Sequence, residues 1–134
     1  TQNELNRPFS ILSVDWQGNF STFDPELLSV ASDRYGTFNL GNLKDLSLVE
    51  STQTDQFRRL MNDMSSGVES CHKGCEYFGL CGGGNGSNKF WEHGTLASSE
   101  THACRFGTQI PVQVLLERFE EGPPLHQTAG NSAV

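Results

Sequence analysis

Four cysteines constrain this chain more than any other feature of its 134-residue sequence. Cys71, Cys75 and Cys81 fall within eleven positions, and Cys104 follows 23 residues later. A close group of three soft ligands with one distant closing ligand is how a chain wraps a metal centre. Four thiolates suit either a zinc ion or an iron–sulfur cluster. The cysteines do not form the two neat pairs typical of zinc sites, yet their spacing alone favours neither metal centre.

The composition indicates one small, loop-rich domain with a thin apolar core. Apolar residues make up 35% of the chain, which also contains 14 Gly and 5 Pro. A metal centre would compensate for the thin core, because the free energy of metal binding contributes to the free energy of folding. The formal net charge of −7 and the lack of a Lys/Arg block argue against nucleic-acid and anionic membrane partners.

Targeting signals are not evident in the sequence. No stretch has the length of a membrane span, and no signal-peptide pattern opens the chain. A disulfide-bonded secreted domain therefore stays a third interpretation, behind the iron–sulfur cluster and zinc. Because the sequence begins at Thr1, we expect a piece of a longer protein.

The first part of the predicted domain is rich in β-structure. After a polar lead-in over residues 1–8, apolar residues alternate on both sides of the turn signal Gln17-Gly18-Asn19, which predicts a β-hairpin. Asp24 and Pro25 then fit the N-cap and first position of a helical turn. We also predict a short strand over residues 37–40 and a small helix over residues 43–50, so that the hairpin and short helix occupy residues 9–50.

Two amphipathic helices are expected to flank the cysteines. The first covers residues 51–69, begins at a capping box that starts with Thr52, and is weakened or ended by Gly67. The second covers residues 109–121. Their apolar faces are predicted to be Phe57, Leu60, Met61, Met64 and Val68 in the first helix, and Ile110, Val112, Leu115, Leu116 and Phe119 in the second.

The segment between these helices, residues 70–105, has little periodicity and is predicted to be a long irregular metal-binding loop. Residues 122–134 are predicted to be a disordered tail. The expected fold is thus a small α+β domain over residues 9–121, with an N-terminal hairpin and two or three helices. Trp16 and Trp91 are expected to be packing residues.

The cysteine run resembles the SPASM region of radical SAM peptide-modifying enzymes, although x3 replaces the usual x2 between the first two cysteines. The match becomes closer along residues 77–84, Ser87-Asn88-Lys89, residues 92–101 and Cys104-Arg105, with an earlier match over residues 14–28. Over roughly residues 10–118 the chain resembles the C-terminal part of the cyclophane-forming maturases of glycine-rich-repeat peptides.

The resemblance implies one auxiliary [4Fe–4S] cluster held by Cys71, Cys75, Cys81 and Cys104. The cysteine that would serve a second auxiliary cluster is replaced by Asn85, and its upstream partners are also missing. The C-x3-C-x2-C motif that binds the SAM-cleaving cluster is missing too. We therefore expect SAM and a further cluster only in a barrel domain or protein that works with this chain, and expect the chain alone to be non-catalytic.

The implied parent enzyme cross-links side chains of a ribosomally made precursor peptide in the bacterial cytoplasm. The auxiliary cluster would accept an electron or help to place the peptide. The candidates for peptide contact are Asn88, Lys89, Glu92 and Glu100, because they lie in the matching run. The alternative is that these four polar side chains belong to a solvated loop with local ion pairs. The alternative function for the whole chain is a zinc-stabilised four-cysteine module that binds a peptide or protein. His72 and His102 could replace a thiolate ligand, but we expect neither to do so.

Overall fold

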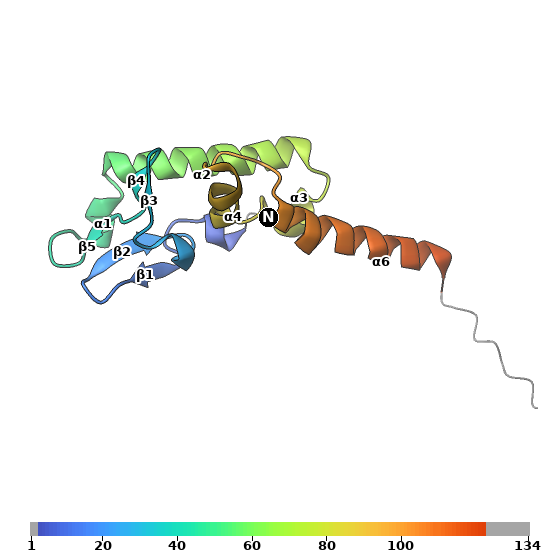
Figure 1. The fold of residues 1–134 in the computed structure, drawn as a ribbon, viewed down its shortest axis with the longest axis horizontal. Helices are drawn as coiled ribbons and strands as arrows, with labels where there is room; N and C mark the ends of the chain where they lie inside the picture. The colour runs from blue at the N-terminus through green and yellow to red at the C-terminus, as the bar shows by residue number, and fades with distance from the viewer. Residues whose placement is uncertain (1–2, 123–134) are drawn as a thin grey trace, which may run out of the picture.

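The fold is that of a small α+β domain, as predicted. A computed structural model describes residues 3–122 of the chain. Helix α2 (Asp55–Gly74) runs along one side of the molecule, and the β-strands lie beneath its N-terminal half (Figure 1). Helix α4 (Gly86–His93) sits below the middle of α2, and the segments that carry the cysteines gather at the C-terminal end of α2.

The predicted hairpin is confirmed. Strands β1 (Leu12–Val14) and β2 (Asn19–Thr22) pair antiparallel, and β5 (Gly41–Asn42) joins the other edge of β2. The Asp15 carboxylate fixes the turn by accepting hydrogen bonds from the backbone N–H groups of Gln17 and Asn19, both at 2.9 Å. Within this turn, Gly18 adopts a φ of +92°, which a side chain would disfavour.

Short elements follow the hairpin. Asp24 caps the 3₁₀ turn η2 (Pro25–Leu27), so its predicted role is confirmed. The predicted strand over 37–40 is mostly wrong, since β4 (Gly36–Thr37) ends at its first residue and pairs with β3 (Ala31–Ser32). The predicted helix over 43–50 is displaced to α1 (Leu48–Ser51), because a capping box between Ser47 and Glu50 sets its start.

An aromatic core joins the strands to α2 and α4. Its buried members are Phe20, Phe23, Leu27, Tyr35, Phe38, Leu40, Leu60, Met64, Phe90 and Leu96. Leu60 and Met64 confirm the predicted face of α2, whereas Phe57, Met61 and Val68 are only partly buried.

The hydroxyl of Tyr35 connects α2 to the segment after α4. It accepts a hydrogen bond from the Leu96 N–H at 2.9 Å and donates to the Asp63 carboxylate at 2.7 Å. Burial raises the pKa of Asp63, but the hydrogen bonds from Tyr35 and Arg34 outweigh it, so that this pKa lies below its usual value. A charged Asp63 at neutral pH thus fixes α2 against the core.

Helix α2 differs from its prediction at both ends. It is capped by Thr54, whose hydroxyl accepts from the Phe57 N–H at 3.1 Å, and not by Thr52. It continues through Gly67 to Gly74 instead of ending near residue 69. Gly67 is buried at a close approach of two segments, so packing rather than helix termination explains this glycine.

The predicted irregular loop over residues 70–105 is wrong, because most of this segment is helical. Besides the end of α2 and the whole of α4, it contains α3 (Phe78–Cys81) and α5 (His102–Cys104). Left-handed glycines such as Gly82 (φ +64°) and Gly94 (φ +70°) end α3 and α4. The glycines that suggested a loop thus terminate helices too short to give a clear period.

The described part of the polar lead-in, residues 3–8, packs against the domain. A 3₁₀ turn, η1 (Glu4–Asn6), packs against the glycine-rich stretch, and Asn6 is fully buried. The Asn3 N–H donates to the Gly82 carbonyl at 2.9 Å, and the Asn6 amide donates to the Gly84 carbonyl at 2.7 Å. The predicted tail lies almost wholly outside the described residues.

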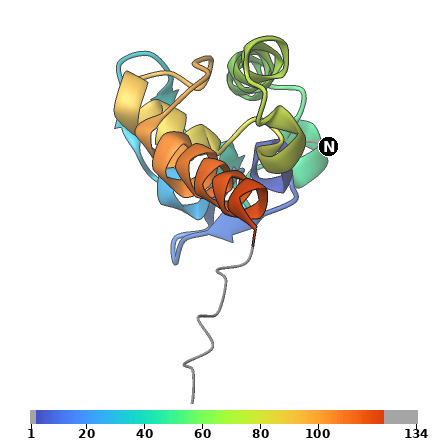
Figure 2. The same ribbon diagram turned by 90° about the vertical axis from the view of Figure 1, so that its right-hand side faces the viewer.

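The bounds predicted for the C-terminal helix agree with the structure to within one residue. The sequence did not predict how this helix is placed relative to the rest of the domain. A π-helical segment, η3 (Arg105–Gln109), leads into α6 (Ile110–Glu121), which extends away from the body of the domain (Figure 1). Viewed nearly along its axis, α6 lies in front of the other elements (Figure 2). Of the apolar face predicted for this helix, Val112 is half-buried, whereas Ile110, Leu115, Leu116 and Phe119 are exposed. Trp16 and Trp91 are exposed too, so the packing predicted for the two tryptophans is wrong.

None of the helices between residues 3 and 122 combines the length and the apolar character that crossing a bilayer requires.

Candidate metal centre

The four cysteines come from three helix ends. Cys71 lies in the last turn of α2 and is 7% exposed, and Cys75 caps the same helix. The Cys75 N–H donates to the Cys71 carbonyl at 3.0 Å, which fixes the relative position of the two residues. Cys81 ends α3, and Cys104 ends α5. All four are free cysteines in the structure.

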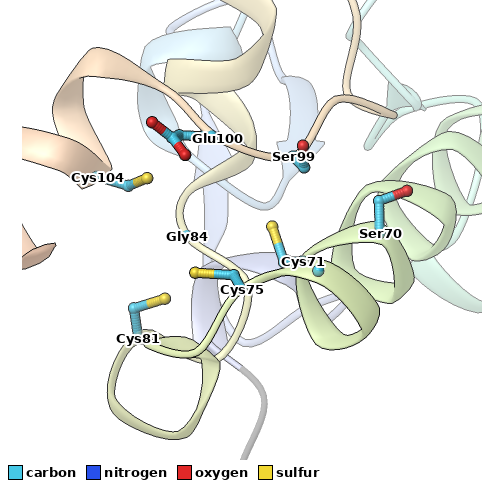
Figure 3. Close-up of a pocket in the computed structure, with 9 residues that line it drawn as sticks. Ser70, Cys71, Cys75, Cys81, Gly84, Ser99, Glu100 and Cys104 are labelled. Carbon is cyan, nitrogen blue, oxygen red and sulfur yellow. The ribbon is translucent and has the colours of Figure 1, made fainter.

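Their side chains face one cavity. It has a volume of about 90 Å³ and is lined by all four cysteines together with Ser70, Gly74, Gly84, Ser99 and Glu100. Figure 3 shows the four sulfur atoms directed into this space from opposite sides. A single buried water needs about 10–15 Å³, so the cavity offers room for a group several times larger.

The thiols surround this cavity without converging on one point. Within residues 3–122, no three His, Cys, Asp or Glu side chains are arranged to hold a single metal ion. One zinc ion requires its sulfur ligands at about 2.3 Å from a common centre. A cluster places its ligands at separate iron atoms, so its thiolates are spread around it.

A run of left-handed glycines brings Cys81 toward α2. Gly82, Gly83 and Gly84 have φ values of +64°, +104° and +70°. A Cβ on Gly83 would lie 3.2 Å from both methyl groups of Val68, so the loop contacts α2 as closely as a glycine permits. The Cys71 thiol donates to the Gly83 carbonyl at 3.6 Å.

Cys104 is positioned by capping interactions. The Thr101 hydroxyl accepts from the Cys104 N–H at 3.0 Å, and the Cys104 sulfur accepts from the Thr101 N–H at 3.4 Å. Glu92, from α4, accepts hydrogen bonds from the N–H groups of His102 and Ala103. Desolvation raises the pKa of Glu92. The hydrogen bonds from these two backbone N–H groups outweigh this effect, so the pKa of Glu92 lies below its usual value.

Lys89, on α4, contacts one of the four cysteines. It is 1% exposed, and its ammonium group donates to the Cys71 sulfur at 3.5 Å. Burial raises the pKa of the Cys71 thiol, while the charge of Lys89 opposes that rise. A buried cation thus stands beside the least exposed of the four thiols.

The residues suggested for peptide contact occupy different places. Glu100 is exposed and lines the cysteine cavity, Glu92 caps α5, Asn88 is half-buried, and Lys89 faces Cys71 rather than solvent. Glu92 and Glu100 also line a second hollow of about 190 Å³, with His93, Thr101, His102 and Arg105. Peptide contact stays a prediction for all four residues, and the surroundings of Lys89 suit it least.

Asn3, Asn6 and Thr101 were not among the candidate site residues, and Lys89 and Glu92 were candidates for peptide contact only, not for support of the cysteines. Asn3 and Asn6 hold the glycine run, Thr101 and Glu92 hold the Cys104 segment, and Lys89 contacts Cys71. The pattern of Thr101 three residues before Cys104 was readable as a helix cap. The burial of Lys89 and Asn6 had no signal in the sequence.

The chain is similar to the uncharacterized protein sll1766 of Synechocystis sp.. The two are 53% identical over 118 residues, which cover 88% of this chain and 30% of the Synechocystis protein. The chain therefore spans about a third of the length of that relative. No family model matches the chain, and no solved structure matches it.

Proposed function

We propose that this chain is an auxiliary [4Fe–4S]-binding domain of a radical SAM enzyme that cross-links side chains in a ribosomally made precursor peptide. The observation that carries the proposal is the single cavity faced by four free thiols from α2, α3 and α5. The cysteine spacing and its resemblance to the SPASM region supply the identity of the group.

The donor set fits such a cluster. Cys71, Cys75, Cys81 and Cys104 would hold it, and thiolates are its usual protein ligands. When bound, the cluster would supply one-electron redox chemistry. Four protein ligands leave no iron open to substrate, so electron transfer or placement of the peptide suits this site better than direct ligation. Glu100, which is exposed at the rim, is the best placed of the candidate peptide contacts.

The SAM-cleaving part of the enzyme would come from elsewhere. This sequence has four cysteines, all in the site, and none left for a C-x3-C-x2-C motif. The Synechocystis relative is much longer than the matched region, which leaves length for a barrel domain in proteins of this kind. A location in the bacterial cytoplasm belongs to the same proposal, because thiols stay reduced there.

The exposed apolar face of α6 supports a barrel partner. Leu115, Leu116 and Phe119 are 56–79% exposed along one face of this projecting helix (Figure 1). An apolar surface of this kind marks an interface. We assign it to the barrel domain, because the relative's additional length offers a covalently linked partner.

Replacing Leu115 by Gln is expected to leave the free energy of unfolding of this chain within about 0.5 kcal/mol of wild type, because the side chain is 57% exposed. In a protein that also contains the barrel, the corresponding substitution is expected to cost about 2 kcal/mol. Thermal denaturation of the two proteins measures the difference. Equal, small effects in both would remove α6 as the barrel interface.

The decisive test of the proposed function is the content of iron, zinc and acid-labile sulfide after anaerobic purification or reconstitution. We expect about four irons and four sulfides per chain, with a broad visible absorption band. One zinc, no sulfide and no colour would instead establish the zinc-stabilised binding module, which the four thiols could also form. A metal-free protein with disulfides would exclude both.

A further inference from the structure

Lys89 has an unusual environment for a lysine. It lies on α4, yet it is only 1% exposed. Its ammonium group donates to the Cys71 sulfur at 3.5 Å. The ion pairs formed among residues 3–122 do not include Lys89.

The packing of α2 and α4 keeps this ammonium group in place. A Cβ built on Gly67 would lie 3.1 Å from the Lys89 Nζ atom, so α2 passes over the lysine with no side chain between them. On the other side, a Cβ on Gly84 would lie 3.9 Å from the lysine Cε. Glycines on two segments thus form a channel that directs the charged end toward Cys71.

A buried cation requires a negative partner to offset its desolvation. A neutral Cys71 thiol supplies only a weak sulfur acceptor. A metal-bound Cys71 is a thiolate, and a four-thiolate [4Fe–4S] centre carries net negative charge that increases by one on reduction. The Lys89 charge is therefore placed where it interacts more strongly with the reduced than with the oxidised centre.

We propose that Lys89 is a positioning residue of the site, a buried counter-ion that raises the reduction potential of the cluster held by Cys71 and its three partners. This inference rests on the proposed function and extends it, because it assigns a role to a residue that is not a ligand. The reduction it concerns is a one-electron step in which the electron comes from an added reductant, and no bond to the protein forms or breaks.

The test compares neutral and charged replacements of Lys89 in the reconstituted chain. Lys89→Met and Lys89→Gln remove the charge at similar length, whereas Lys89→Arg retains it. Lys73→Met is the matched control, because Lys73 also lies near the C-terminal end of α2 but is 72% exposed and paired with Glu69. The reduced fraction of cluster is measured by electron paramagnetic resonance during a dithionite titration with mediators.

We expect both neutral variants to lower the ratio of reduced to oxidised cluster about tenfold or more at a fixed solution potential, equivalent to about 59 mV for one electron. Lys89→Arg, which retains the buried charge, is expected to stay within about threefold of wild type. Lys73→Met is expected to do the same, because the charge that it removes is exposed and screened by water. Iron content and far-UV circular dichroism are recorded for each variant. If Lys89→Met does not fold, Lys89→Gln against Lys89→Arg supplies the same comparison.

Two results would overturn the inference, and they differ in what else they overturn. A folded, cluster-loaded neutral variant with the wild-type ratio would reject the role of Lys89 and leave the proposed function intact. A wild-type chain that holds no cluster after anaerobic reconstitution would reject both.

Discussion

Replacing any one of the four cysteines by alanine is expected to remove at least about half of the acid-labile sulfide from anaerobically reconstituted protein. The reason is that all four thiols face the same cavity, so each is needed to complete one ligand set. Cys71→Ala should have the largest effect, because Cys71 is the most buried cysteine and contacts both Lys89 and Gly83.

The cavity itself offers a matched control. Ser99 lines the same space but is no thiol, and it is exposed on the segment before α5. Ser99→Ala should retain the wild-type iron and sulfide content. Comparing it with the cysteine variants separates the loss of a ligand from a change in the shape of the cavity.

Stability should follow metal content in these variants. Because a bound centre contributes its binding free energy to folding, the cysteine variants should melt at a lower temperature than wild type after reconstitution. Without metal, wild type and Cys104→Ala should melt at similar temperatures, since Cys104 is only partly buried. If one cysteine variant kept full sulfide and the wild-type melting temperature, that residue would not be a ligand.

Elements fixed by local sequence were predictable. Asp15 and Gly18 make the hairpin turn with their own neighbours, and Asp24 caps the turn that follows it. These interactions join residues at most four positions apart, so the residue types alone indicate the structure. The structure also brings the four cysteines to one cavity, as their close spacing suggested, whereas their role as metal ligands stays a prediction.

Features fixed by contacts between distant segments were not predictable. Local propensity predicts Gly67 to be a helix breaker, although it lies where α2 meets residues 96–98. The Asn6 side chain donates to the carbonyl of Gly84, which is 78 positions away in the chain. Lys89, on α4, donates to the sulfur of Cys71, on α2. A single sequence contains no signal for such pairs, so the residues that support the cysteines, unlike the cysteines themselves, required the structure.

Gly67→Ala is expected to lower the free energy of unfolding by about 2 kcal/mol. A Cβ at this position would lie 2.3 Å from the Leu96 carbonyl oxygen and 2.9 Å from that of Ser98, both closer than carbon and oxygen can approach. Overpacking of this kind costs about 1–3 kcal/mol or more. The better helix propensity of alanine returns about 1 kcal/mol at most. Because both obstacles are backbone atoms, the two segments must separate.

Gly107→Ala is the matched control for this substitution. Gly107 lies in the helical segment η3, is exposed, and has nothing within 4 Å of a built Cβ. Here alanine should be neutral or should stabilise the chain by up to about 1 kcal/mol. Chemical denaturation of metal-free wild type and both variants gives the comparison without a contribution from bound metal.

The Gly67 substitution should also affect the metal centre, although Gly67 is no ligand. Gly67 is one turn before Cys71 in α2, and a Cβ added to it would lie 3.1 Å from the Lys89 ammonium group. Separating α2 from the segment at residues 96–98 moves Cys71 away from Cys104, which follows that segment by six residues. We therefore expect Gly67→Ala to bind less iron than Gly107→Ala after identical reconstitution. Equal stability and equal iron content in the two variants would show that α2 does not pack on this segment in solution. The proposal that this close contact supports the cavity would then be rejected.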